Sequence, residues 1–432
     1  MSDYLHWFWT TFDPFYVTAA MGSAFSLING SSLLFWGLLY GLVRFTVPEY
    51  VAGIAYIFNR KAFATPALQR YAAAPPLVSV IIAGRNPGAS IVRTIQSVLD
   101  NDYQNVEVIF ADDHSTDNSV ALARAFERTG RVRVFANANH SGKPANLNLA
   151  LMFARGEFIF TLDADSNVYP DTIHQALPYF EDPRVGAVAL GIYVRNKTAS
   201  LMTRFQCIEY PLTYTLMQVW RDKINFLSIL PGMGSMFRAS ALRGLGGYDM
   251  GLGDDTDMTL RLRKAGWRLR MALRARISTD VPVSLDHLLR QRSRWTRNMV
   301  KMRLRKHRDM ATFRYGFTNA MLFYDNVVDR VIHPVFTLGL LLYANFILGK
   351  DDAIVIGGLY TATTILLIIK MLIVSDMIGE PPAGSYWLAP LYAFYRVPLL
   401  FNQVFQVVRE LLFIKPWHPY VPRRIWDQIP HH

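Results

Sequence analysis

The distribution of apolar and polar positions divides the chain into a middle part and two flanks. Residues 76–200 alternate short β-rich runs with helical stretches, whereas long uncharged apolar runs lie on either side. Such alternation predicts an α/β domain with a parallel sheet and helices on its faces. The expected strands are VSVIIAGR (78–85), VEVIFADD (106–113), VRVFAN (132–137), FIFTLDAD (158–165) and VGAVALGIYV (185–194). The expected helices span 89–99, 117–129, 144–155 and 170–181.

The long apolar runs predict helices that cross a membrane. The candidates are Phe25–Val43, Val331–Gly349, Ala353–Val374 and Tyr386–Val408. The first contains about 19 residues without a charge, close to the length that spans the hydrocarbon core. The last is interrupted by Pro390, Arg396 and Pro398, so a spanning helix and a re-entrant or interfacial segment fit it equally well.

The charges around the first apolar run predict its orientation. The first 24 residues contain Asp3 and Asp13 but no Lys or Arg, and basic residues follow the run, at Arg44, Arg60, Lys61 and Arg70. The positive-inside rule therefore places residues 44–330 on the cytoplasmic side of a bacterial-type inner membrane. No secretory signal peptide is evident. The single cysteine, Cys207, excludes an intrachain disulfide and fits a reducing compartment.

The positive charge of the chain is concentrated in one stretch. The formal net charge is +12, and residues 261–314 contain seventeen Lys or Arg against Asp280, Asp286 and Asp309. Such a stretch could bind nucleic acid, but no zinc-finger, RNA-recognition or helix-turn-helix signature is present. Beside apolar helices, a basic strip is more typical of contact with anionic lipid headgroups and phosphates. We therefore expect a lipid bilayer and no nucleic acid as partner.

Acidic residues follow two of the predicted strands. Asp112 and Asp113 end one strand, and Asp163 and Asp165 end another. Ligands of open parallel sheets bind outside the carboxyl ends of strands. Because Asp163 and Asp165 are two residues apart, they point to the same side if the strand continues, and can share one divalent ion. Each pair is also compatible with a turn or a helix cap. Neither a P-loop nor a GxGxxG fingerprint follows the first strand.

Two further motifs lie between residue 250 and the C-terminal apolar runs. Asp254 and Asp255 precede a predicted helix, where a simple N-cap would have the same composition. The segment LLRQRSRWTRN (288–298) fits a basic interface helix anchored by a tryptophan. It also fits a binding site, because the Trp295 ring can stack on a sugar and Arg292 or Arg294 can fork onto phosphate oxygens.

Taken in order, these motifs resemble those of the membrane-integrated family 2 glycosyltransferases, which include cellulose, chitin, hyaluronan and poly-N-acetylglucosamine synthases. The resemblance covers roughly residues 76–300 and implies a cytoplasmic GT-A domain, Rossmann-like with a mostly parallel sheet, and flanking transmembrane helices. It divides the chain into an N-terminal membrane segment (1–75), the GT-A domain (76–285), interfacial helices (286–330) and a C-terminal membrane region (331–432).

The resemblance also implies a role for each motif on the donor side. Asp112 and Asp113 match the acidic motif that contacts the nucleoside of a nucleotide sugar, usually a UDP-sugar. Asp163 and Asp165 match the DxD site, with Mg²⁺ or Mn²⁺ as the cofactor. Lys143, in GKPANLNLAL, matches a Gly-Lys segment that precedes the DxD strand, and we assign it to donor binding.

On the acceptor side, Asp255 matches the catalytic base. Gln291, Arg294 and Trp295 match the QxxRW motif, in which Arg294 is expected to hold the diphosphate. The expected acceptor contacts are Gln291, Trp295, and Gly234 and Ser235 in PGMGSMFR. The sequence departs from the family where His114 replaces a common Gly and Asp254 a common Glu, and where the first strand is followed by Ala83-Gly84-Arg85-Asn86-Pro87-Gly88, which bears on the choice of donor.

The function expected from these matches is inverting, metal-dependent glycosyl transfer. The favoured reading is a processive synthase that extends a β-linked exopolysaccharide and exports it through its own membrane channel. One alternative is a non-processive transferase that adds a single sugar to a polyprenyl phosphate or a glycolipid. An alternative of another class is a membrane transporter or scaffold with a degenerate nucleotide-binding domain. The sugar, the acceptor, and any export or regulatory subunits stay open.

Overall fold

A single mixed sheet forms the centre of the molecule. The computed structural model describes residues 47–250, 253–339, 352–379 and 385–413. Within the described residues, the sheet has eight strands in the order β3-β2-β1-β4-β7-β6-β8-β5. Their bounds are β1 Val78–Gly84, β2 Val106–Asp112, β3 Val132–Ala136, β4 Phe158–Asp163, β5 Ser166–Val168, β6 Val185–Val194, β7 Gly234–Arg238 and β8 Arg268–Thr279. The five expected strands are confirmed as β1 to β4 and β6.

The sheet is less parallel than the sequence suggested. Strands β3, β2, β1 and β4 run parallel, but β7 is antiparallel to both of its neighbours, and β5 is antiparallel to β8. Strand β8 was not predicted because arginines alternate with apolar residues along it and hide it in the basic stretch. Strand β7 was not predicted because it has only five residues and begins with glycine.

Helices cover both faces of the parallel half, and β1 shows why. Its residues alternate between two apolar clusters, with Val80 and Ile82 in one and Ile81 and Ala83 in the other. A strand buried on both faces reads as a continuous apolar run. The covering elements are α6 (Ser90–Leu99), α7 (Ser119–Arg124), η3 (Glu127–Thr129), α8 (Lys143–Phe153), α9 (Thr172–Ala176) and η4 (Leu177–Glu181). The predicted helix 117–129 is therefore a short α-helix followed by a 3₁₀ turn.

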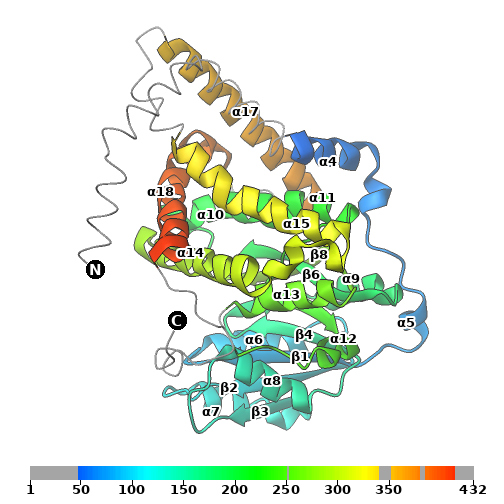
Figure 1. Cartoon of the computed structure of the whole chain (residues 1–432). Coiled ribbons are helices and arrows are strands. Elements are labelled where there is room, and N and C mark those ends of the chain that lie inside the picture. Colours follow the sequence, from blue (N-terminus) through cyan, green and yellow to red (C-terminus); the bar gives the residue numbers. More distant parts are fainter. Residues whose placement is uncertain (1–46, 251–252, 340–351, 380–384, 414–432) are drawn as a thin grey trace.

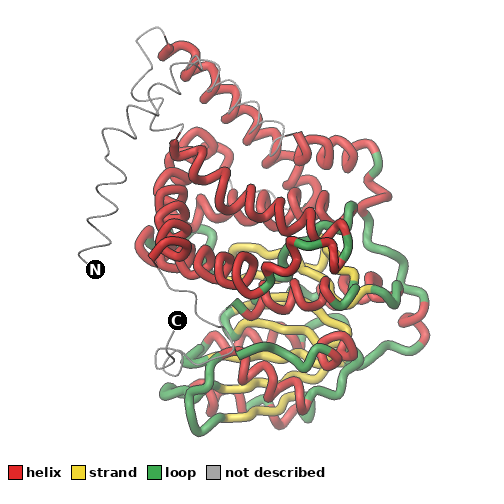
Figure 2. Tube along the Cα trace, in the orientation of Figure 1, coloured by secondary structure: helices red, strands yellow, loops and turns green. Residues whose placement is uncertain are grey.

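Beyond the sheet lies a layer made almost entirely of helix (Figure 1 and Figure 2). Its elements are α4 (Val47–Phe58), α10 (Leu201–Pro211), α11 (Met217–Lys223), α14 (Leu285–Met299), α15 (Phe317–Val327), α17 (Asp352–Ile378) and α18 (Ala389–Val408). Helix α14 packs against α18, and α17 contacts both α4 and α18. Helix α13 (Asp254–Lys264) lies between the sheet and this layer (Figure 1). Side chains of α13 can therefore contact both the sheet and the helical layer.

Among the described residues, one stretch is long and apolar enough to cross a membrane. It is Tyr360–Ile378 in α17, which overlaps the predicted run Ala353–Val374. The run Phe25–Val43 and most of Val331–Gly349 lie outside the described residues. The multi-pass arrangement therefore stays a prediction.

The interrupted run Tyr386–Val408 forms an amphipathic helix. Buried Tyr395 and Leu399 lie on one side of α18, whereas Phe394 and Phe405 remain 66% and 62% exposed. The residues that point inward contact α10 and α14, since Tyr395 stacks on Phe205 and Asn402 accepts a hydrogen bond from Ser293. The exposed apolar side chains fit lipid contact both in a spanning helix and in an interfacial one, so the alternatives stay open.

Candidate active site

The acidic pair after β2 fixes the loops at the edge of the sheet. Asp112 is 1% exposed, and its carboxylate accepts hydrogen bonds from the backbone and the hydroxyl of Ser115. Asp113 accepts from the backbone of Ser141 at 2.8 Å and Gly142 at 3.1 Å. Burial acts to raise the pKa of Asp113, but these donors outweigh it and lower the pKa below its ordinary value. Asp113 therefore anchors the N-terminus of α8.

Lys143 is the first residue of α8 and reaches across the strand ends. Its Nζ lies 2.5 Å from Oδ1 of Asp163 and 3.3 Å from the carbonyl oxygen of Gly232. Burial acts to lower the pKa of Lys143, but the charges of Asp163 and the acidic pair 254–255 raise it above its ordinary value. The ammonium group therefore stays charged and links the DxD strand end to the loop beside Asp255.

The DxD pair occupies the end of β4 and the following turn. Asp163 is the last residue of β4, and Asp165 lies 3.4 Å from the hydroxyl of Ser166 and 3.5 Å from that of Thr279. Burial and the charge of Asp163 raise the pKa of Asp165, as expected for two carboxylates that repel each other.

Two neighbouring carboxylates of this kind fit a hard divalent cation, which would relieve their repulsion. The described part of the chain contains no group of three or more His, Cys, Asp or Glu that could hold a metal ion. A cation at Asp163 and Asp165 would therefore need further ligands from the donor diphosphate or from water.

Asp254 and Asp255 open α13, and neither acts as its N-cap. The N-cap is Gly253, at φ +83°, where an added Cβ would lie 3.0 Å from Met302. Asp255 lines a small pocket at the foot of this helix. Its other lining residues are Leu147, Thr161, Leu230, Pro231, Gly232, Phe237, Tyr248, Asp254 and Met258. Burial and the charge of Asp254 raise the pKa of Asp255 to about 6, which suits a general base near neutral pH.

The loop before β7 is held against Asp255 by buried arginines. Arg263 donates to the carbonyl oxygens of Asn225 and Leu227, and Arg303 donates to that of Ser228. Both arginines belong to the basic stretch that we expected to contact lipid. Their burial shows that part of this stretch stabilises the site from inside the protein.

The expected acceptor residues of β7, Gly234 and Ser235, are both buried. Ser235 is 1% exposed, and its hydroxyl donates to the carbonyl oxygen of Pro231 at 2.8 Å. A Cβ on Gly234 would collide with Ile277. The geometry gives both residues a role in shaping the loop around residues 231–233, and their part in acceptor binding stays a prediction.

Helix α14 carries the QRSRW motif, and its side chains have different surroundings. Arg294 is exposed, whereas the side-chain oxygen of Gln291 is buried with no hydrogen-bond partner among the described residues. Trp295 packs against the core of the sheet domain. The guanidinium of Arg292 lies 4.2 Å from the Trp295 ring centroid, so one face of the indole is covered. Of the two arginines in QRSRW, Arg294 is therefore the one that is exposed and could contact a phosphate.

Arg292 takes part in a buried network that the sequence analysis missed. It contacts Glu209 of α10 at 2.9 Å, and Glu209 also accepts from Tyr395 at 2.6 Å and lies 3.7 Å from Arg396. Burial acts to raise the pKa of Glu209, but Arg292 and Arg396 lower it below its ordinary value. The network joins α10, α14 and α18 around a single carboxylate. Its sequence signal is one acid within the apolar run FQCIEYP.

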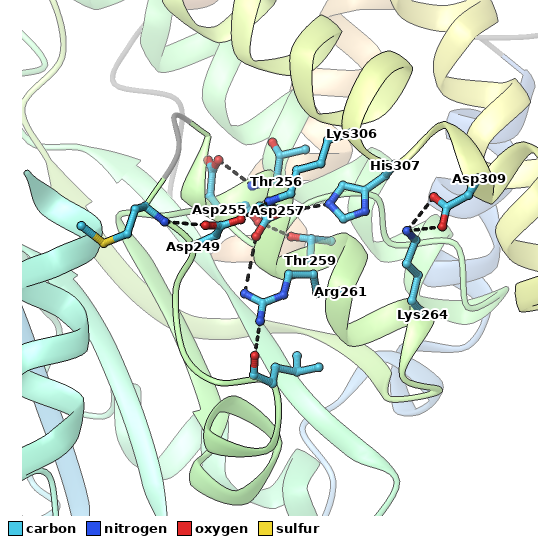
Figure 3. Close-up of polar contacts among 12 residues, drawn as sticks. Asp249, Asp255, Thr256, Asp257, Thr259, Arg261, Lys264, Lys306, His307 and Asp309 are labelled. Atoms are coloured by element: carbon cyan, nitrogen blue, oxygen red, sulfur yellow. Dashed lines mark hydrogen bonds and ion pairs between the residues drawn. The ribbon is translucent and has the colours of Figure 1, made fainter. Parts of the chain in front are cut away.

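A second buried cluster surrounds Asp257 of α13 (Figure 3). Asp257 contacts Nζ of Lys306 at 2.5 Å and Nε2 of His307 at 2.8 Å, and Lys306 also contacts Asp249 at 2.5 Å. The Lys306 side chain is only 3% exposed. The cluster fixes the helix of Asp255 to the segment that follows α14.

Comparisons with known proteins agree with this geometry. A family model described as glycosyl transferase family 2 matches residues 79–246. A beta-monoglucosyldiacylglycerol synthase from Synechocystis sp. is 30% identical over 227 residues, which cover 51% of this chain and 47% of that protein. A poly-beta-1,6-N-acetyl-D-glucosamine synthase from Staphylococcus epidermidis is 26% identical over 230 residues, which cover 53% of this chain and 56% of that protein. The chain thus spans about half the length of the curated relatives it matches.

A solved structure shares the fold over most of the chain. It is a mannosyltransferase from Pyrobaculum calidifontis in complex with GDP-Man and Mn²⁺. The superposition has a TM-score of 0.60 and covers 88% of this chain and 99% of that one, at 19% sequence identity. The mixed sheet and its helices are therefore a GT-A-like, Rossmann-like fold.

Proposed function

We propose that the chain is a glycosyltransferase of family 2 and that it transfers a sugar, with inversion, from a nucleotide sugar to the end of a growing β-linked glycan at a membrane. The observation that carries this proposal is the meeting of two carboxylate sites at one edge of the sheet. Lys143 links the DxD strand end to the Gly232 loop, and that loop packs against Asp255. This arrangement would bring a donor-binding site and a base together.

The donor would lie across the ends of β1, β2 and β4. Its nucleoside would approach Asp112 and Asp113, and its diphosphate would approach Asp163, Asp165 and the accessible Arg294. A divalent cation held by Asp163 and Asp165 would supply charge stabilisation for the departing diphosphate. UDP-sugars are the first donors to test, and GDP-sugars the second, because the solved neighbour contains GDP-Man.

Asp255 would act as the base of a single displacement. The acceptor hydroxyl attacks the anomeric carbon as the bond from that carbon to the diphosphate oxygen breaks, and Asp255 takes the hydroxyl proton. One displacement inverts the anomeric configuration. The pocket around Asp255 is lined mainly by apolar side chains, which limit the access of water that would compete with the acceptor.

The acceptor has two candidate classes, each favoured by one observation. Gln291, Arg294 and Trp295 on α14 support a glycan acceptor and a processive reaction. The cover that Arg292 places over Trp295 reduces the free stacking surface and supports a single transfer to a lipid. The curated relatives include proteins named for each product class. Sizing the radiolabelled product of purified protein in lipid separates the two, since a polymer or ladder supports the synthase and one glycolipid supports the second candidate.

Substitutions on α14 test whether its motif binds substrate or only the membrane surface. We expect Arg294→Lys to lower activity at least about tenfold, because lysine keeps the charge but loses the planar fork that binds phosphate. Trp295→Ala should shorten the product or reduce its yield while leaving nucleotide binding unchanged. Arg290→Lys is a matched control, because Arg290 is exposed and its ion-pair partner among the described residues is Asp286. Normal product from both variants would leave the motif with a membrane role alone.

We also propose that the catalytic domain faces the cytoplasm, on the inner side of a bacterial-type plasma membrane. The support is the charge asymmetry of the sequence and the exposed apolar faces of α4 and α18. A reporter fused after Arg70 should behave as cytoplasmic. Periplasmic reporter activity there would separate the site from its nucleotide sugar and overturn the orientation.

A further inference from the structure

Lys143 and Asp163 form an ion pair at the place where the proposed function puts a metal ion. The Lys143 ammonium lies 2.5 Å from Oδ1 of Asp163. Asp163 is also the first residue of the DxD pair. A divalent cation on the same carboxylate would lie within a few ångströms of the ammonium, and the two positive charges would repel each other. Withdrawal of the lysine from Asp163 would therefore strengthen metal binding there.

The surroundings of Lys143 allow such a movement. Its side chain is 34% exposed and that of Asp163 is 33% exposed, so neither is enclosed by the core. Lys306 provides a contrast within the same chain, because its side chain is 3% exposed and lies between Asp249 and Asp257. A lysine has a flexible four-carbon stem, and its ammonium can exchange one anionic partner for another.

The charge balance gives the movement a direction. Asp163, Asp254 and Asp255 all act on Lys143, whose positive charge partly balances theirs. A donor brings a diphosphate, a second anionic partner for the ammonium, and that partner also supplies oxygen ligands for the metal. Departure of Lys143 and arrival of the metal would then occur together.

We infer that Lys143 competes with the divalent cation for Asp163, so that the metal binds tightly only with a nucleoside diphosphate, to which the ammonium moves. The competition at Asp163 is inferred from the contact between Lys143 and Asp163. The exchange onto the diphosphate rests on the proposed function. The enzyme would therefore hold its metal weakly between turnovers and recruit it with each donor.

The competition is tested by titrating Mn²⁺ alone into the purified full chain in lipid nanodiscs, with free Mn²⁺ measured by electron paramagnetic resonance. Lys143→Met removes the charge but keeps the length of the side chain, and we expect it to bind Mn²⁺ at least about tenfold more tightly than wild type. Lys143→Arg keeps the charge and should bind as weakly as wild type. Arg93→Met controls for net charge, because Arg93 is exposed and its hydrogen-bond partner in the described part of the chain is Ser90, outside the site.

Equal Mn²⁺ affinities in wild type and Lys143→Met would overturn the inference, and so would tight binding by Lys143→Arg. The exchange is tested by repeating the titration with UDP and with GDP. The nucleotide should tighten Mn²⁺ binding in wild type by at least about tenfold more than in Lys143→Met, because binding free energies are coupled reciprocally. Equal tightening would contradict the exchange. If neither nucleotide binds, the proposed donor is wrong, and the titration with Mn²⁺ alone still decides the role of Lys143.

Discussion

Asp255→Asn should lose glycosyl transfer by about 10²-fold or more while still binding the donor nucleotide, as expected for removal of a general base. Asparagine keeps the shape of the side chain and can still accept the hydrogen bond from the Thr256 backbone at 2.6 Å. It cannot take a proton from the acceptor. The measurement is nucleoside diphosphate release together with equilibrium binding of the nucleotide.

The control and the pH dependence sharpen this result. Asp102→Asn changes an exposed carboxyl away from the site and should leave the rate unchanged. In the wild type, the base works in its deprotonated form, so the rate should fall as the pH drops through about 6. Because the charge of Asp254 helps to raise the pKa of Asp255, Asp254→Asn should move the acidic limb of the pH–rate profile to lower pH. An active Asp255→Asn variant with an unchanged acidic limb would assign the base to another residue.

Asp165→Ala should reduce activity to background, with a loss of about 10²-fold or more, because it removes one of two carboxylates that would hold the divalent cation. Excess chelator should have the same effect on the wild type, and added Mg²⁺ or Mn²⁺ should restore it. Asp102→Ala serves as the matched control. Full turnover of the wild type in excess chelator would show that the DxD pair acts without a metal.

The parallel half of the fold was predictable from sequence because its strands are buried on both faces. Runs such as VSVIIAG and VEVIFAD contain little except apolar residues, and their ends were placed within two residues of β1 and β2. The antiparallel half was less visible. Strand β8 places its arginines between apolar residues, and periodicity alone does not separate such a strand from a basic surface segment.

Individual site residues were predictable where they end strands, and their contacts were not. The positions of Asp113 and Asp163 follow from the carboxyl-end rule for parallel sheets. The pairing of Asp163 with Lys143 depends on where α8 begins, which Asp113 sets through the backbone of Gly142. No local sequence pattern predicts this chain of contacts.

The Glu209 network was missed for a related reason. Its partners Arg292 and Tyr395 lie 83 and 186 residues further along the chain, so only the packing of α10 against α14 and α18 brings them together. The same packing determines which arginine of QRSRW is available. Arg292 contacts Glu209, and Arg294 remains exposed, a distinction that composition and spacing do not make.

The most direct test of the central claim is nucleoside diphosphate release from the purified full chain in lipid, measured across a panel of UDP- and GDP-sugars. We expect the wild type to release diphosphate from one donor, in step with the appearance of a glycan or glycolipid, and Asp255→Asn to release almost none. No release by the wild type with any donor would contradict the assignment and return the chain to the transporter or scaffold class.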